Sequence, residues 1–354
     1  MNIFKKIVAA ALVCLMALTV IGCHPKDEIA VTIDGHEYTS GYYMCALINA
    51  YMEGQQEVYN NLSEEEASST EIDFFSKKIE EKSFSDWVKD RAIETLKETS
   101  IYKSLCRDNK LELTDEDRAN TEYYASFYWS SYGYSELFEP NGVSQDTYTV
   151  YMLDGSYAGL YFEHLYGKGG EKEIAAADVE TKLYSDFLIA NLLEVTFSEE
   201  TDTEKTAIKN KFVEYEKNLK NRKMTFEEVY VDYNKEENHK HEETEGGPKD
   251  PHATVIGKEG TGYEHEYYKE IKELKTGEVK LIEKAENAGY CLVVKQDITA
   301  DGYYLENMDM TVRQLLKYEE YSKDMEKQAE KLEAEINKYA VNQFKVKNIK
   351  EPQY

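Results

Sequence analysis

The sequence predicts an α+β protein in which helical regions at both ends of the chain flank one small region that mixes strands and helices. Three observations predict this class. Amphipathic helical patterns dominate the first half of the chain, strand signals alternate with two helices over residues 187–300, and a long helical pattern occupies residues 308–341.

The first residues have the order of an export signal. Two lysines precede an uncharged apolar run over 7–21, which is short for a membrane span, and Val-Ile-Gly-Cys closes it at Cys23. This ending resembles the lipobox of bacterial lipoproteins, which implies that residues 1–22 are removed and that Cys23 carries a lipid. An ordinary cleaved signal with a chance cysteine is the alternative. Both interpretations predict a protein that works outside the cytoplasm.

The N-terminal part predicts a hairpin followed by helices. Alternating apolar residues over 29–33 fit a strand, and Asp34-Gly35 is a typical hairpin turn. Thr39-Ser40 can cap the helix that follows, and an apolar stripe predicts a second helix over about 85–107. Thr114, with acidic residues directly after it, predicts the start of a third helix.

The middle of the chain changes character. Its predicted elements are a strand at 187–197, a charged helix at 204–221, a shorter helix at 225–234, a polar loop at 235–251, and strands at 254–257, 277–281 and 289–295. This order predicts a small α+β domain. Beyond it, apolar residues spaced by threes and fours over 308–341 predict one long helix that packs on the N-terminal helices.

Composition limits the classes of partner. The chain has 69 aspartates and glutamates against 42 lysines and arginines, a formal net charge of −27. Nucleic-acid binding needs a basic surface, so we expect no nucleic-acid partner. An anionic membrane would repel the same charge, so membrane attachment would depend on the lipid. The sequence contains no CxxC, HExxH, GxSxG or glycine-rich phosphate loop, so we expect no cofactor.

The elements together resemble the PrsA-type foldases, the SurA-type periplasmic chaperones and their trigger-factor-like relatives. The resemblance rests on IAVTIDGHEYTSGYY near the N-terminus, on DNKLELTDED after the second helix, and on AAADVETKLYSDF before the middle region. It implies a helical chaperone domain over 23–186, an inserted parvulin prolyl-isomerase domain over 187–300, and a C-terminal part, 301–354, that completes the chaperone domain.

The middle region resembles parvulins in four segments, which read NLLEVTF, MTFEEVYVDYN, LKTGEV and AGYCLVVKQDI. Active parvulins carry one histidine in the first of these strands and one in the last. The matching positions here are Asn191 and Cys291, so both imidazoles are missing, and the resemblance implies weak or absent catalysis. Tyr263 and Tyr267 match the apolar lining of the family's proline pocket, and with Tyr290 they form the predicted binding groove.

The resemblance therefore implies a lipid-anchored foldase at the outer face of the cell membrane that binds unfolded, newly exported polypeptides. An active prolyl isomerase is one alternative. A solute-binding lipoprotein is another, although the chain lacks the repeated βα units of that class.

Two further features have open interpretations. The tract over 122–166 is rich in aromatic residues, which could form either the core of the N-terminal domain or a surface that binds polypeptides, since tyrosine combines apolar area with a polar tip. His239, His241, His252 and His265 could chelate a metal, but the acidic, glycine-containing stretch around the first two favours a mobile loop. We predict no metal site.

Overall fold

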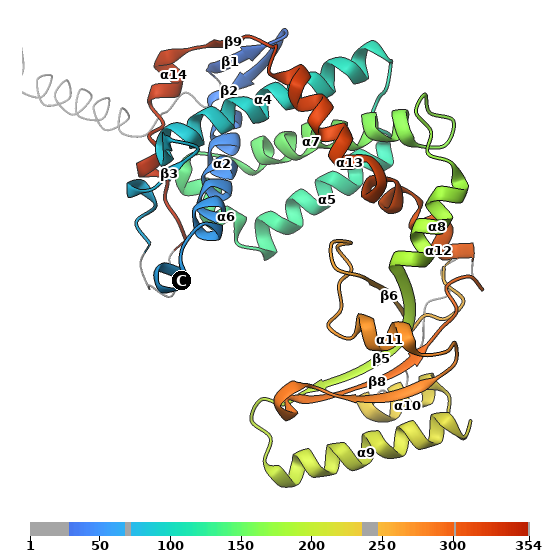
Figure 1. The fold of residues 1–354 in the computed structure, drawn as a ribbon. Helices are drawn as coiled ribbons and strands as arrows, with labels where there is room; N and C mark the ends of the chain where they lie inside the picture. Colours follow the sequence, from blue (N-terminus) through green and yellow to red (C-terminus); the bar gives the residue numbers. More distant parts are fainter. Residues whose placement is uncertain (1–27, 68–71, 236–246, 301, 353–354) are drawn as a thin grey trace, which may run out of the picture. The chain divides into compact units, whose positions relative to one another are not determined.

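The computed structural model describes residues 28–67, 72–235, 247–300 and 302–352. Its chain divides into two compact units (Figure 1). The helical unit contains the chain up to Leu165 and, again, the chain from Glu320 onward, and the sheet unit runs from Tyr166 to Glu319. One unit is thus interrupted in sequence by the other, which confirms the predicted α+β class with a split helical part.

The helical unit begins with the predicted hairpin. Strand β1 (Ile29–Ile33) pairs antiparallel with β2 (His36–Thr39) through a turn at Asp34 and Gly35, where both residues have positive φ. Helix α2 (Ser40–Asn60) follows directly, and the side chain of Thr39 caps it by accepting a hydrogen bond from the backbone N–H of Tyr42.

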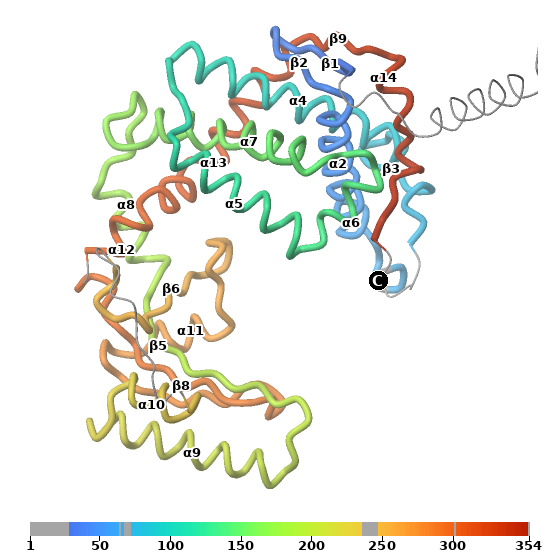
Figure 2. Tube along the Cα trace, turned by 180° about the vertical axis from the view of Figure 1, so that it is seen from behind, coloured from blue at the N-terminus to red at the C-terminus, as the bar shows by residue number. Residues whose placement is uncertain are grey.

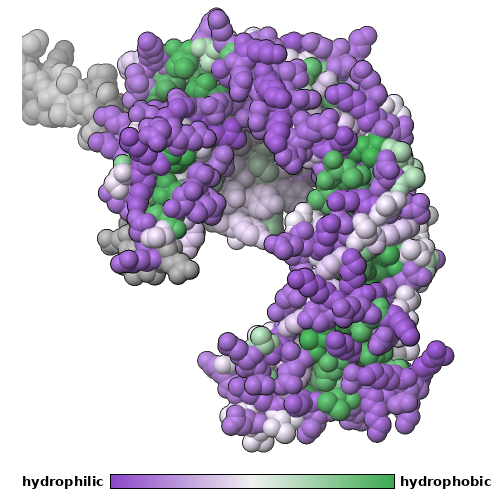
Figure 3. Space-filling view, in the orientation of Figure 1, coloured by the Kyte–Doolittle hydropathy of each residue, from purple (hydrophilic) through white to green (hydrophobic). Residues whose placement is uncertain are grey.

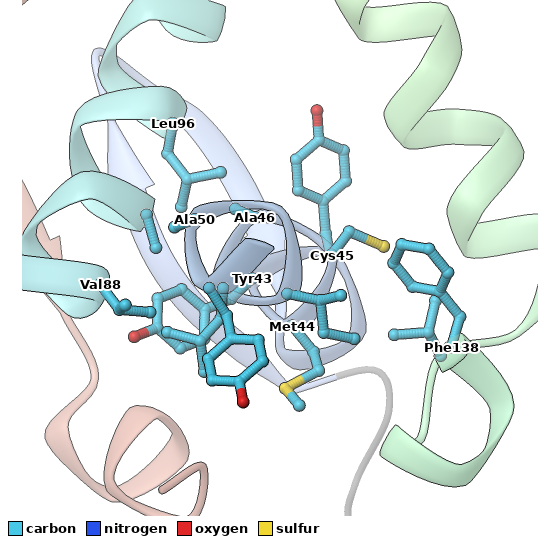
Figure 4. Close-up of a cluster of buried hydrophobic side chains, with 14 of the residues drawn as sticks. Tyr43, Met44, Cys45, Ala46, Ala50, Val88, Leu96 and Phe138 are labelled. Atoms are coloured by element: carbon cyan, nitrogen blue, oxygen red, sulfur yellow. The ribbon is translucent and has the colours of Figure 1, made fainter. Parts of the chain in front are cut away.

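Helix α2 lies at the centre of the core of this unit. Figure 4 shows its residues Tyr43, Cys45 and Ala46 between Leu96 of helix α4 (Phe84–Asp108) on one side and Phe138 on the other. The two helices approach so closely that a Cβ on Gly54 would lie 3.0 Å from the ring of Phe84. This close packing explains why a glycine stands inside α2.

Three helices complete the first part of the unit: α5 (Asp115–Ser131), α6 (Tyr134–Phe138) and α7 (Gln145–Tyr166). Thr114 and Asp117 form a capping box at the start of α5, as the sequence predicts. Trp129 anchors α5 to the core, with its ring 6.2 Å from that of Phe138 and 5.6 Å from that of Tyr148.

The predicted helix over 308–341 is wrong in its length. Helix α13 (Asp309–Ala329) ends twelve residues earlier, and β9 (Ala334–Ile336) and α14 (Lys338–Asn342) follow it. The reason is tertiary pairing, because β9 adds to the N-terminal hairpin as the antiparallel neighbour of β1 (Figure 2). The predicted docking on the N-terminal helices is confirmed at Tyr321, whose hydroxyl donates to the carbonyl of Ala158.

The sheet unit is built around one antiparallel sheet with the strand order β6-β5-β8-β7. Its elements are α8 (Ala176–Asp186), β5 (Phe187–Thr196), α9 (Asp202–Lys220), α10 (Phe226–Asn234), β6 (Ala253–Gly257), α11 (Tyr268–Glu273), β7 (Val279–Glu283), β8 (Gly289–Lys295) and α12 (Gly302–Asn307). Residues of α9 and α10 pack on one face of the sheet, and residues of α11 pack on the other (Figure 1). The strands and helices predicted for this region are confirmed, although β7 begins two residues later than predicted and α11 was not predicted.

Candidate functional site

A row of exposed aromatic side chains runs along α5 and ends at Tyr132, the residue that caps its C-terminus. Tyr123, Tyr124, Phe127 and Tyr132 are 65%, 51%, 39% and 63% exposed, and Tyr128 is half-buried beside them. We call these five residues the α5 aromatic surface. Ala125 and Trp129 are the buried residues of the same helix, and they lie on its opposite side.

The five rings form a continuous row because helical residues three or four apart are neighbours. The rings of Tyr123 and Phe127 are nearly parallel, with centroids 6.3 Å apart, and those of Tyr124 and Tyr128 are stacked at 6.2 Å. Tyr132 closes the row with edge contacts to Phe127 and Tyr128, both at 5.5 Å. Exposed aromatic area that is contiguous in this way is uncommon on a protein that has no partner.

A cavity of about 410 Å³ adjoins this surface between α5 and α7. Its lining residues are Thr121, Tyr124, Tyr128, Tyr151, Met152, Gly155 and Ser156. A hydrogen bond of 3.2 Å between the hydroxyls of Thr121 and Ser156 joins the two helices beside it. An added Cβ on Gly155 would meet no atom within 4 Å, so the glycine leaves the cavity open on the α7 side.

The aromatic tract over 122–166 therefore serves two structural roles. Trp129, Phe138, Tyr148 and Phe162 are buried, which confirms the core interpretation for these rings. The rings of the α5 aromatic surface stay outside the core. Elsewhere, hydrophilic residues cover most of the visible face of each unit, with small apolar patches between them (Figure 3).

The two positions that match the parvulin histidines do not face each other. Glu194 and Cys291 are direct partners in the β5–β8 register and lie on one face, whereas Asn191, three residues before Glu194, lies on the opposite face. Buried Asn191 donates to Asp250 at 2.9 Å and accepts from Gln296 at 2.9 Å. Burial raises the pKa of the Cys291 thiol to about 12, so the thiol stays protonated and is a poor nucleophile.

The three tyrosines predicted for the groove are also separated by the sheet. Tyr267 packs with Cys291 in the cluster under α11, and Tyr290 packs with Phe212 in the cluster under α9 and α10. Tyr263 lies 40% exposed with its ring edge-on to Phe187 at 5.8 Å. Tyr267 and Tyr290 thus contribute to two cores and do not line one common groove.

A polar cluster that the sequence analysis missed lies on the Cys291 face. The carboxylate of Glu194 pairs with Lys284 at 2.6 Å and with His265 at 3.2 Å, and the other ring nitrogen of His265 accepts the Tyr267 N–H at 3.2 Å. Burial opposes ionisation of Glu194, but the hydrogen bonds from Lys284 and His265 outweigh it and lower the pKa. Both oxygens of the carboxylate are occupied, so it fixes the 265–267 loop and is poorly placed as a base.

The sequence contains a signal for this cluster, because Glu194 is the one charged residue within the strand segment NLLEVTF.

The histidines give no metal site among the residues that the structure describes. His252 pairs with Glu227, and His265 with Glu194, while His239 and His241 lie outside the described residues, as does Cys23.

The fold defines a class: a helical unit interrupted by a small antiparallel α+β unit, with an aromatic surface on one helix. Among solved structures, the chain is similar to foldase protein PrsA from Lactococcus lactis, with 12% identity over 89% of this chain and 96% of that chain and a TM-score of 0.38. It is also similar to PrsA from Bacillus subtilis (17% identity, 70% and 86% covered, TM-score 0.36) and to foldase protein PrsA from Streptococcus pneumoniae (12% identity, 74% and 88% covered, TM-score 0.35).

All three structures are PrsA proteins, and the PrsA-type foldases are among the proteins that the sequence resembles. A scan against protein-family models and a search of curated proteins gave no match. No helix within the described ranges combines the length and the apolar character that crossing a membrane requires.

Proposed function

We propose that this protein is a lipid-anchored extracytoplasmic chaperone that binds unfolded, exported polypeptides through the α5 aromatic surface. The observation that carries the proposal is the row of five aromatic rings on the side of α5 that faces away from the core. Exposed aromatic area of this kind gains free energy when an apolar segment of another chain covers it.

The binding mode follows from the chemistry of the rings. Tyrosine offers a large apolar face and a hydroxyl that can remain hydrated, so one surface can accept many different sequences. Burial of one aliphatic side chain contributes about 1.5–3 kcal/mol, which suits transient, reversible binding when only a few side chains engage. The adjoining cavity is large enough for such a side chain, and the strong negative charge of the chain favours soluble complexes.

The parvulin-like sheet unit serves in this proposal as a second lobe without an efficient isomerase centre. The separation of Asn191 and Cys291 onto opposite faces supports this role, since a pair of groups that act on one peptide bond must lie on the same side. The raised pKa of Cys291 supports it as well. Attachment through a lipid on Cys23 belongs to the same proposal and rests on the lipobox resemblance.

The experiment is the refolding of a denatured protein whose slow phase is limited by proline isomerisation, with residues 24–354 added. We expect a higher final yield at an unchanged slow rate. The yield gain should disappear when Tyr123, Phe127 and Tyr132 are replaced by serine. Tyr339→Ser is the matched control, because Tyr339 is a 73% exposed tyrosine on α14 and not part of the aromatic surface.

An unchanged yield in the presence of the wild-type chain would refute the chaperone function. A faster slow phase would identify an active isomerase instead and would refute the non-catalytic role of the sheet unit. Lipid attachment is tested separately, by mass spectrometry of the mature N-terminal peptide from cells that express the chain with Cys23 or with Cys23→Ser.

A further inference from the structure

The α5 aromatic surface lies in a part of the chain that is almost free of positive charge. Between Asp115 and Tyr166 the sequence contains nine aspartates and glutamates and a single lysine or arginine, Arg118. Elsewhere the chain carries many lysines, often next to acidic residues. Of these nine carboxylates, Asp154 pairs with Lys103 of α4 at 2.7 Å, so the segment still carries an excess of negative charge.

Two of these carboxylates lie in line with the rings. Glu116 precedes Tyr123 by seven residues and Asp117 precedes Tyr124 by the same interval, which is about two helical turns, so each shares a face with its tyrosine. Both acidic residues are exposed. Asp117 accepts hydrogen bonds from Thr114, which lower its pKa further below neutral pH.

The faces of the rings are also available to cations. A tyrosine or phenylalanine face carries negative electrostatic potential and attracts ammonium and guanidinium groups. The chain uses this contact elsewhere, as in Lys103 over Tyr38 at 5.7 Å and Lys272 over Tyr268 at 5.4 Å. Among the described residues, no cation–π contact involves the five rings of the α5 aromatic surface.

We propose that the α5 aromatic surface selects unfolded segments in which lysine or arginine stands next to apolar side chains. This inference rests on the proposed function and adds the chemical class of the bound segment. The apolar side chains cover the rings and enter the cavity, while the neighbouring cations lie over ring faces and close to Glu116 and Asp117. A segment with glutamate at the same places would meet like charges and would bind less tightly.

The test uses three short unstructured peptides that share their apolar residues and differ only at the intervening positions, which are lysine, serine or glutamate. Their affinity for residues 24–354 is measured by fluorescence anisotropy. We expect the lysine peptide to bind about tenfold more tightly than the serine peptide, because two exposed cation–π contacts each contribute a few-fold. The glutamate peptide should bind most weakly, and high salt should reduce the differences.

Two variants test whether the preference for the lysine peptide arises at the α5 aromatic surface. Glu116→Gln should lower the lysine preference, with Glu333→Gln as the control, an exposed glutamate far along the chain near β9. Phe127→Leu keeps an apolar side chain but removes the ring face, so it should weaken the lysine peptide more than the serine peptide. Circular dichroism of each variant, which monitors helix content, separates these effects from a loss of folding.

Equal affinity for all three peptides would overturn this inference and leave the proposed function standing. A lysine preference that survives both Glu116→Gln and Phe127→Leu would also overturn it, since the preference would then arise from the net charge of the whole chain. If no peptide binds, the proposed function fails as well.

Discussion

Tyr124 of α5 and Gly155 of α7 line the same cavity, and the glycine contributes no side chain to it. A glycine inside a helix costs about 0.5–1 kcal/mol relative to alanine. No neighbouring atom requires the absence of a Cβ at Gly155, so packing within this chain does not explain the residue. An open cavity beside the aromatic surface does explain it if the cavity receives a side chain from a bound polypeptide.

The first prediction concerns a substitution that fills this cavity with a side chain. Gly155→Leu should raise the free energy of unfolding by about 0.5–1 kcal/mol because leucine favours a helix, and it should also weaken binding of an unfolded polypeptide. Gly159→Leu is the matched control, since Gly159 lies one turn further along α7, has the same free space and does not line the cavity. Urea unfolding and peptide affinity check both effects. Equal binding by the two variants would remove the cavity from the binding site.

A second prediction concerns Gly289, the first residue of the central strand β8. Gly289 has φ +152°, and a Cβ there would lie 1.9 Å from the carbonyl oxygen of Val195. Gly289→Ala should therefore destabilise the unit by about 2–3 kcal/mol. Gly277→Ala should cost only about 1 kcal/mol, because Gly277 has φ +78° but free space around its Cα. Denaturant midpoints that rank the two variants in the reverse order would contradict the described strand pairing.

A third prediction concerns Arg313, which is fully buried in the sheet unit. Its guanidinium pairs with Asp309 at 2.7 Å and donates to the carbonyls of Tyr166 and Ile174, both at 2.8 Å. Arg313→Leu would leave the partly buried carboxylate of Asp309 and two carbonyls without their donor, so we expect a loss of about 3–5 kcal/mol. Thermal unfolding would measure it. The exposed ion pair of Arg107 gives the control, for which Arg107→Leu should change stability by less than about 1 kcal/mol.

The fourth prediction is a pH dependence at Asp186, a buried carboxylate that pairs with Lys182 and Lys258, both at 2.8 Å. Burial raises its pKa, but the hydrogen bonds from these two lysines outweigh burial and lower the pKa to about 2. Since the folded pKa lies below the unfolded value, the stabilisation is present above about pH 4 and is lost as the pH falls toward 2.

Asp186→Asn should thus lower stability at neutral pH and converge with the wild type as the pH falls. Urea unfolding of both proteins at several pH values measures the difference, and the comparison cancels the titration of the other carboxylates. A difference that stays constant with pH would show that the ion pairs of Asp186 contribute nothing to stability.

Local sequence signals predicted much of this fold. Asp34-Gly35 fixes a hairpin because both positions accept positive φ, and Thr39 and Thr114 mark helix starts because their hydroxyls accept backbone N–H groups. The strands of the sheet unit were predicted from apolar runs between turn residues. These features depend on neighbours within a few residues of one another, which a single sequence contains.

The errors arose where distant segments decide the structure. Ala334–Ile336 carries a helical spacing pattern but forms β9, because β1, about 300 residues earlier, offers an edge to pair with. The opposite faces of Asn191 and Cys291 follow from the β5–β8 register, which the sequence does not state. The composition of the tract over 122–166 predicts a cluster of aromatic residues but not which of them are buried. Trp129 is buried whereas the rings of the α5 aromatic surface are not, and this difference depends on how α5 packs against the rest of the unit.

The most direct test of the central claim is site-specific crosslinking. A photoreactive amino acid is placed at position 123, 127 or 339 of residues 24–354, and the protein is irradiated with an unfolded polypeptide and, separately, with the same polypeptide in its folded form. We predict crosslinks from positions 123 and 127 to the unfolded chain alone, and none from position 339. Crosslinks of equal yield from all three positions, or none from positions 123 and 127, would contradict the assignment of the α5 aromatic surface as the polypeptide-binding site.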